Sequence, residues 1–177
     1  KIRMYVIFLF VFFAGLISTP IVFSQDMPEM DEIEFKFTGG QTFDNSQLKD
    51  AIALSKSSVF NLNLVEGDIG KLKKFYFDNG FFDVEVDTSI RIDREESEAS
   101  ITFKITENKR YKLDSAIITG IDKIPTETLG KVRRIYTIKK GDNYNKVLIL
   151  QYGNEILDTL QNNGYMNARY KIDSGTV

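Results

Sequence analysis

The sequence predicts an α+β protein made of two successive copies of a small unit, each with the element order strand, helix, helix, strand, strand. Three observations favour this fold class. Alternating apolar and polar residues mark the strands, and apolar residues at three- and four-residue spacing mark the helices. In addition, Asn79-Gly80 recurs as Asn163-Gly164, 84 residues further along the chain. A repeat of this length is typical of small domains in tandem.

The first copy begins with a half-buried strand and a short helix. Ile33, Phe35 and Phe37 alternate with polar residues until the chain reaches Gly39-Gly40. Residues Asp44 to Ser46 are N-cap candidates for the short helix, because Asp, Asn and Ser side chains accept hydrogen bonds from the free N–H groups of a first helical turn. Both elements are amphipathic, so each must bury one face against the rest of the unit.

A longer helix and a β-hairpin complete the first copy. The helix begins around Asn63, has its apolar residues at helical spacing, and ends at Asn79-Gly80. Residues 82–92 and 99–105 alternate between apolar and polar on either side of a charged turn, Arg94 to Glu98. This pattern predicts an antiparallel hairpin in which each strand buries one face and exposes the other.

The same order then begins again. Tyr111 to Thr119 predicts a strand, Pro125 to Ile135 a short helix, and Tyr144 to Asn163 a longer helix. The alternation from Ala168 to Ile172 predicts the next strand, but the chain ends at Val177 before a third strand can return. Without that strand the apolar helix faces are uncovered and backbone groups are unpaired. We therefore expect an incomplete second copy and a natural protein that continues.

The N-terminus has the pattern of a secretory signal peptide, residues 1–24. A positive start is followed by an apolar run that reaches Ile17, and Ser24 is a small residue suited to the position before the cut. The alternative is an uncleaved membrane anchor, because Met4 to Phe23 contains 20 residues, enough to span a bilayer. Under both interpretations the rest of the chain is exported. Residues 25–32 then form an acidic linker.

The composition excludes several kinds of site. The chain has no Cys and no His, so it cannot form a disulfide, a thiolate nucleophile, a His-bearing triad or a Cys/His metal site. A net charge of −2 does not indicate a nucleic-acid partner. A carboxylate-based hydrolase would need two acidic side chains that point into one cleft. The acidic residues of this chain instead lie on solvent-exposed strand faces and in turns. We therefore expect no catalytic residue, no cofactor and no metal.

The repeated order resembles the POTRA domain. In the first copy the matching residues are Phe35 to Gly40, Phe60, Asp68, Leu72, Tyr76, and Gly80 to Val86. In the second copy they are Ala116 to Gly120, Gly141 to Tyr144, Ile156, Leu160 and Gly164-Tyr165. The resemblance implies a three-stranded sheet covered by two helices, with the third strand central and the other two as edges. It gives a first POTRA-like domain at 33–108 and a second, incomplete one at 111–177.

An export signal followed by tandem POTRA domains is similar to the periplasmic arm of the BamA/TamA superfamily. The resemblance implies a non-enzymatic role in outer-membrane β-barrel assembly, insertion or translocation in a Gram-negative-type bacterium. It implies unfolded outer-membrane or secreted polypeptides and periplasmic accessory proteins as partners, and a C-terminal barrel that this chain does not contain. The alternatives are an inner-membrane-anchored divisome-type POTRA protein and a purely structural periplasmic spacer.

The candidate binding site is a free strand edge in the first copy. Its unpaired N–H and C=O groups can be satisfied by an extended peptide that adds a strand, and barrel precursors are made of alternating strands. Outward acids along the strand discourage permanent edge-to-edge aggregation. The alternative is an inert edge that serves only the fold. The predicted peptide-binding edge consists of Asp83, Val84, Glu85, Val86, Asp87, Thr88, Ser89 and Ile90.

Overall fold

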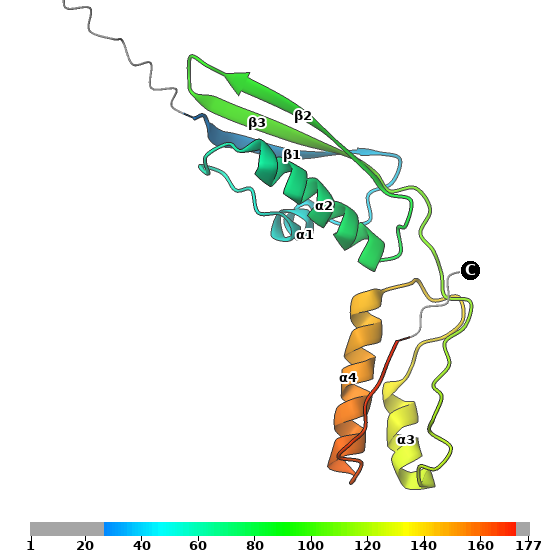
Figure 1. The fold of residues 1–177 in the computed structure, drawn as a ribbon. Helices are drawn as coiled ribbons and strands as arrows, with labels where there is room; N and C mark the ends of the chain where they lie inside the picture. Colours follow the sequence, from blue (N-terminus) through cyan, green and yellow to red (C-terminus); the bar gives the residue numbers. More distant parts are fainter. Residues whose placement is uncertain (1–26, 173–177) are drawn as a thin grey trace, which may run out of the picture.

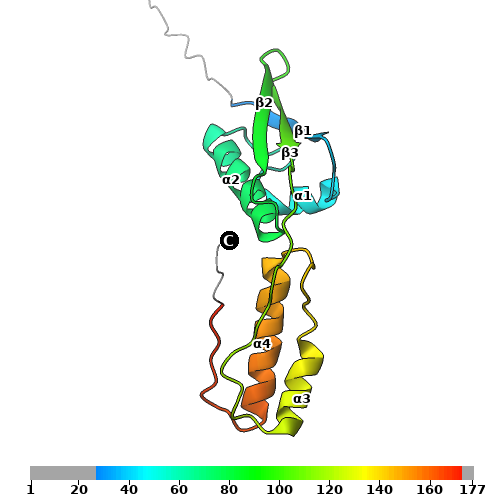
Figure 2. The ribbon, with the colours of Figure 1, turned by 90° about the vertical axis from the view of Figure 1, so that its right-hand side faces the viewer.

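The computed structural model describes residues 27–172, which form two units arranged end to end (Figures 1 and 2). The predicted signal segment, the start of the linker and the last five residues, 173–177, lie outside the described residues. None of the helices in residues 27–172 has the length and apolarity that a membrane crossing requires.

The first unit is built on a three-stranded sheet. Its strands are β1 (Glu29–Thr38), β2 (Glu85–Asp93) and β3 (Glu98–Thr106), in the spatial order β1-β3-β2. β2 and β3 form the antiparallel hairpin, whereas β1 runs parallel to β3. A parallel pair needs a crossover connection, which the two helices between β1 and β2 supply. The mixed α+β class is confirmed, and the third strand is central as expected.

β1 begins four residues earlier than the alternation predicted, at Glu29 instead of Ile33. The register between β1 and β3 shifts between Met30 and Glu32. A bulge of this kind changes which residues face the core. Met30 is therefore buried although it breaks the alternation that Ile33 and Phe35 continue. A period-two pattern cannot reveal a strand across such a shift.

Two helices cover one face of this sheet (Figure 2). α1 (Asn45–Ala51) is capped by Asp44, which forms a reciprocal capping box with Gln47. α2 (Leu62–Asp78) begins one residue before the predicted Asn63, because the side chain of Asn61 is the cap and accepts from the Asn63 N–H. The two helices stack their apolar faces on the sheet, which leaves the opposite face of the sheet open to solvent.

The core of the first unit lies between β3 and α2. Ile101, Phe103 and Ile105 of β3 are buried, as are Leu72 and Tyr76 of α2. Because β3 is the central strand, its inward side chains are flanked by those of both neighbours and lose the most solvent. Such burial contributes about 1.5–3 kcal/mol for each large apolar side chain, so this layer dominates the stability of the unit.

A buried carboxylate fixes the segment after α1. Asp68 is fully buried and accepts hydrogen bonds from the N–H groups of Ala53 and Leu54, both at 2.8 Å. Lys71, one turn further along α2, contacts the same carboxylate at 2.8 Å. Since these contacts bind a loop to the middle of α2, Asp68 sets where α1 sits on the sheet.

The second unit contains α3 (Thr126–Ile135) and α4 (Lys146–Asn162), which pack against each other. The strands predicted at 111–119 and 168–172 are not formed, and one isolated bridge joins Lys112 to Asn143. In the first unit both outer strands depend on the central β3, and the described residues of the second unit include no equivalent strand. The strand predictions for these two segments were therefore wrong for the structure described.

Without a sheet, α3 and α4 keep part of their apolar surface exposed. No side chain of α4 is fully buried, and Val147 is 62% exposed. The one buried apolar residue of this helix pair is Val132 of α3. The second unit as described therefore consists of a helical layer without the strands that a complete copy would pack against it.

The two units meet at a tight joint around Gly80. The Tyr111 N–H donates to the Gly80 carbonyl at 2.8 Å, and the Asn145 side-chain amide donates to Oδ1 of Asn79 at 3.0 Å. Gly80 has φ +93°, and a Cβ placed on it would lie 2.8 Å from the carbonyl oxygen of Tyr144. The joint thus requires glycine both for the backbone conformation and for the close approach.

Candidate polypeptide-binding edge

The direction of the main-chain groups of β2 follows from one hydrogen bond at the hairpin. The carbonyl of Ser97 accepts from the Glu29 N–H of β1 at 2.9 Å. Because C=O and N–H of one trans peptide unit point in opposite directions, the Glu98 N–H points to β2. Along an antiparallel pair, every second residue exchanges backbone hydrogen bonds with its partner. The hydrogen-bonded pairs therefore run from Asp93 and Glu98 at the hairpin to Glu85 and Thr106 at the other end.

It follows that the intervening residues of β2 direct their backbone away from β3. Val86, Thr88, Ile90 and Ile92 each present one N–H and one C=O to the outer edge of the sheet. No other described element lies along that side of β2 in Figure 1, and no backbone group of residues 27–172 is bonded to these four residues from that side. The free edge, as we call the outward backbone of β2, therefore offers a row of unpaired donors and acceptors.

The other edge of the sheet is not equivalent, because a loop covers the first part of β1. The Met30 N–H donates to the Ser58 carbonyl at 2.8 Å, and the Ser57 N–H donates to the Met30 carbonyl at 2.7 Å. The Phe60 N–H adds a bond to the Pro28 carbonyl at 2.8 Å. The loop thus occupies the positions that an incoming strand would use, which the sequence did not reveal.

The start of the predicted site is also closed. Asp83 and Val84 precede β2, and Asp83 lies in the turn that follows α2. The Asn108 side-chain amide donates to the Asp83 carbonyl at 2.7 Å, and the Tyr111 hydroxyl donates to the Asp83 carboxylate at 2.8 Å. The hydrogen bond to that carboxylate raises the pKa of Tyr111. Asp83 and Val84 are therefore not part of the strand, contrary to the prediction.

The remaining predicted residues, from Glu85 to Ile90, lie in β2, and the strand continues through Arg91, Ile92 and Asp93. These last three residues belong to the same strand but were not among the predicted ones, although the alternation already extended to Ile92. The free edge is thus shifted along the chain from the predicted range.

The two faces of β2 differ in chemistry. Val86, Thr88 and Ile90 point to the helix side, where Val86 is buried. Ile92 shares that side but is 48% exposed, because the helices do not reach the end of the hairpin. The opposite face carries the polar residues of the strand, Glu85, Asp87, Ser89, Arg91 and Asp93. A strand added to this edge would meet apolar groups on one side and charged groups on the other.

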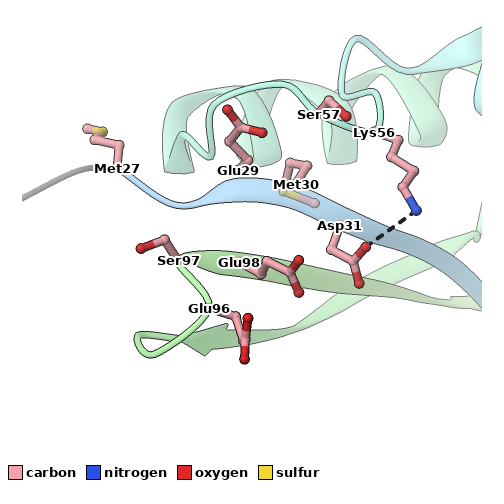
Figure 3. A pocket seen from close by; sticks show the side chains of 9 residues that line it. All are labelled: Met27, Glu29, Met30, Asp31, Lys56, Ser57, Glu96, Ser97 and Glu98. Carbon is pink, nitrogen blue, oxygen red and sulfur yellow. Dashed lines mark ion pairs between the residues drawn. The ribbon is translucent and has the colours of Figure 1, made fainter.

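A hollow lies at the hairpin end of the sheet, beside the turn (Figure 3). Its volume is about 450 Å³, and acids including Glu29, Asp31, Glu96 and Glu98 line it. Lys56 pairs with Asp31 at 3.4 Å. In Figure 3 these side chains spread along the strands and do not converge on a centre, unlike the few convergent polar groups of a typical ligand site.

The acids of the described chain do not form a metal centre. Within residues 27–172 no group of three or more acidic side chains has the arrangement that a metal ion requires. In the hairpin turn, Asp93 instead accepts hydrogen bonds from the N–H groups of Glu95 and Glu96, at 3.0 and 3.2 Å. The Asp93 carboxylate therefore stabilises the turn itself.

Comparison with known proteins identifies the first unit. The POTRA family, described as "Surface antigen variable number repeat", matches residues 33–108. The "Outer membrane protein assembly factor BamA" of Buchnera aphidicola is 28% identical over 122 residues, which are 68% of this chain and 19% of that protein. The BamA of Neisseria meningitidis is 24% identical over 150 residues, which are 78% of this chain and 18% of that protein.

Two solved structures of POTRA domains are similar to this chain. POTRA3-5 of Haemophilus influenzae BamA matches with a TM-score of 0.48 at 20% identity, covering 79% of this chain and 57% of that one. POTRA1-2 of Omp85 from Anabaena matches with a TM-score of 0.43 at 18% identity, covering 84% and 87%.

The chain spans less than a fifth of the length of the curated relatives it matches. Over the shared part, the family match coincides with the strand-helix-helix-strand-strand unit whose third strand is central. Residues 33–108 therefore form a POTRA domain.

Proposed function

We propose that this chain belongs to the periplasmic, non-enzymatic arm of a factor that assembles or inserts outer-membrane β-barrels, or translocates polypeptides. Its clients are unfolded polypeptides, and they bind by adding a strand to the free edge of β2. The observation that carries the proposal is this edge, whose outward groups come from Val86, Thr88, Ile90 and Ile92. The names of the relatives, outer-membrane assembly factors, support the same function.

Strand addition suits clients of varied sequence. Main-chain hydrogen bonds do not depend on side-chain identity, so one edge can hold many different extended segments. Each such bond contributes about 0.5–1.5 kcal/mol net, and a short segment therefore binds weakly and reversibly. Weak binding is what a protein that passes its client onward requires, since a tightly held strand would not be released.

The proposal also assigns the rest of the chain. Residues 1–24 are an export signal, residues 25–32 a linker, and residues 111–177 the beginning of a second POTRA-like domain that lacks its third strand. The repeated motifs of the sequence and the joint at Gly80 support a second domain directly after the first. Periplasmic accessory proteins and the outer membrane are the further partners of this assembly.

A proline on the free edge tests the binding mode. Thr88 is half-buried and presents its N–H outward, so Thr88→Pro removes one donor without removing a bond to β3, a position at which edge strands accept proline. With a peptide of about ten residues that alternates Val and Thr, the length of a barrel strand, we expect binding to weaken by about 2- to 12-fold. Thr88→Val keeps the N–H and leaves binding unchanged.

A peptide variant makes the test independent of protein folding. N-methylation of the peptide at every second residue removes the donors of one edge, so one of the two methylation patterns abolishes binding and the other preserves it. Equal binding by both patterns contradicts strand addition. A structural spacer would instead bind none of the peptides, in the wild-type chain or in any variant.

A further inference from the structure

The charges beside the free edge are unevenly distributed along β2. At the hairpin end, Arg91 and Asp93 form an ion pair at 3.8 Å. At the other end, Glu85 and Asp87 are both exposed and form no ion pair with another described residue. Acidic side chains without an ion pair are thus concentrated on the first half of the strand.

The residues opposite the two acids on the central strand differ, because only Asp87 has a cation across from it. Across the pair, Glu85 lies opposite Thr106 and Asp87 opposite Lys104 on the central strand. Lys104 therefore lies on the inner side of Asp87, away from the free edge. A strand added outside β2 would place side chains about 4.5–5.5 Å from Glu85 and Asp87, on a side where the described chain supplies no cation.

The helix-facing side of the same edge requires a different residue type. Ile90 is half-buried and Ile92 is 48% exposed, because α2 does not extend to the end of the hairpin. An added strand would cover these side chains with its own alternate residues, and apolar ones would gain most from leaving water. The two faces together define a sequence pattern in the strand that binds.

We infer that the free edge selects extended segments in which apolar residues alternate with basic ones, with two Lys or Arg side chains beside Glu85 and Asp87. This inference rests on the proposed function and deepens it, since it specifies the chemical class of the client. Main-chain hydrogen bonds can form with any extended segment. Glu85 and Asp87 then favour segments with basic residues opposite them, and this preference fixes the register. The half of the segment beside Arg91 has no such requirement.

The test compares three peptides of about ten residues, the length of a barrel strand, on the full chain. All three alternate Val with polar residues, and they carry two Lys, two Glu or two Thr at the selected positions. Opposite charges directly across two strands favour the Lys peptide over the Thr peptide by about 2- to 30-fold in total. The Glu peptide binds more weakly than the Thr peptide, and raising the salt to 1 M reduces both differences.

Two variants separate local from overall charge. Glu85→Gln with Asp87→Asn removes the preference for Lys. Glu32→Gln with Asp50→Asn changes the net charge equally at exposed sites away from the free edge, and it keeps the preference. Equal binding of all three peptides, or a preference that survives the first double variant, overturns the inference and leaves strand addition intact. Failure of every peptide to bind overturns the proposed function itself.

Discussion

Replacing Gly80 by alanine should open the joint between the two units while leaving the POTRA domain folded. Two costs follow from the structure. The φ of +93° is costly for a residue with a Cβ, by about 1–2 kcal/mol. The added Cβ would also lie 2.8 Å from the Tyr144 carbonyl oxygen and 3.2 Å from that of Tyr111, and forcing atoms into occupied space costs about 1–3 kcal/mol.

The sequence repeat supplies a matched control. Gly164 occupies the equivalent position after α4 and has φ +96°, yet a Cβ there would meet nothing within 4 Å. Gly164→Ala therefore carries the conformational cost without the collision. The difference between the two variants isolates the collision at the joint, which the molecule relieves by moving Tyr144 and Tyr111 away from the end of α2.

Amide hydrogen exchange measures this opening. The Tyr111 N–H donates to Gly80 at 2.8 Å, and the Tyr144 N–H donates to Tyr111 at 3.0 Å. Because the collision costs about 1–3 kcal/mol, these two amides should exchange about 5- to 150-fold faster in Gly80→Ala than in Gly164→Ala. Equal exchange rates at Tyr111 in the two variants would refute the reasoning.

Two further predictions concern the core of the POTRA domain. Asp68→Ala leaves two backbone N–H groups without an acceptor and should lower the free energy of unfolding, measured in urea, by about 2–5 kcal/mol. Lys71→Met removes a half-exposed cation and keeps both of these hydrogen bonds, so it should cost less than Asp68→Ala. Burial and the charge of Glu107 raise the pKa of Tyr76 above its ordinary value. The contribution of the neutral Tyr76 hydroxyl to the free energy of unfolding is therefore fully present below about pH 10 and is lost as the pH rises further. Tyr76→Phe should make this alkaline decline less steep. A decline of unchanged steepness would contradict the assignment.

Much of the first unit could be predicted because its residues follow local rules. Asp44 caps α1 as an N-cap residue should, and Asn79-Gly80 ends α2 with a positive φ at the glycine. The hairpin alternates correctly because each of its strands has one face on the core. These features depend on neighbours within a few residues of the chain, and sequence patterns report such neighbours directly.

The accessibility of the two sheet edges could not be predicted, because it depends on contacts between distant backbone groups. Ser57 and Ser58 cover β1 through their N–H and C=O groups, and any residue type carries these groups. The same holds for Asp83, whose carbonyl is occupied by Asn108. The predicted edge therefore lies on a strand whose outer side the structure leaves free, but the limits of that edge required three-dimensional information.

The second unit shows the limit of alternation as a signal. Residues 168–172 alternate as β2 does, yet they form no strand in the described structure. A strand is stabilised by its neighbour, so a pattern that fits a sheet is not sufficient where no partner strand is present. Helices α3 and α4 form because their hydrogen bonds are internal.

The central claim is that a client strand pairs with the outward backbone of β2. Hydrogen exchange of the full chain, with and without the Val/Thr peptide, tests it residue by residue. The account predicts that the peptide slows exchange at Val86, Thr88, Ile90 and Ile92 and leaves the amides already bonded to β3, such as that of Ser89, unchanged. Protection that appears along β1, or equally at both sets of β2 amides, would contradict it.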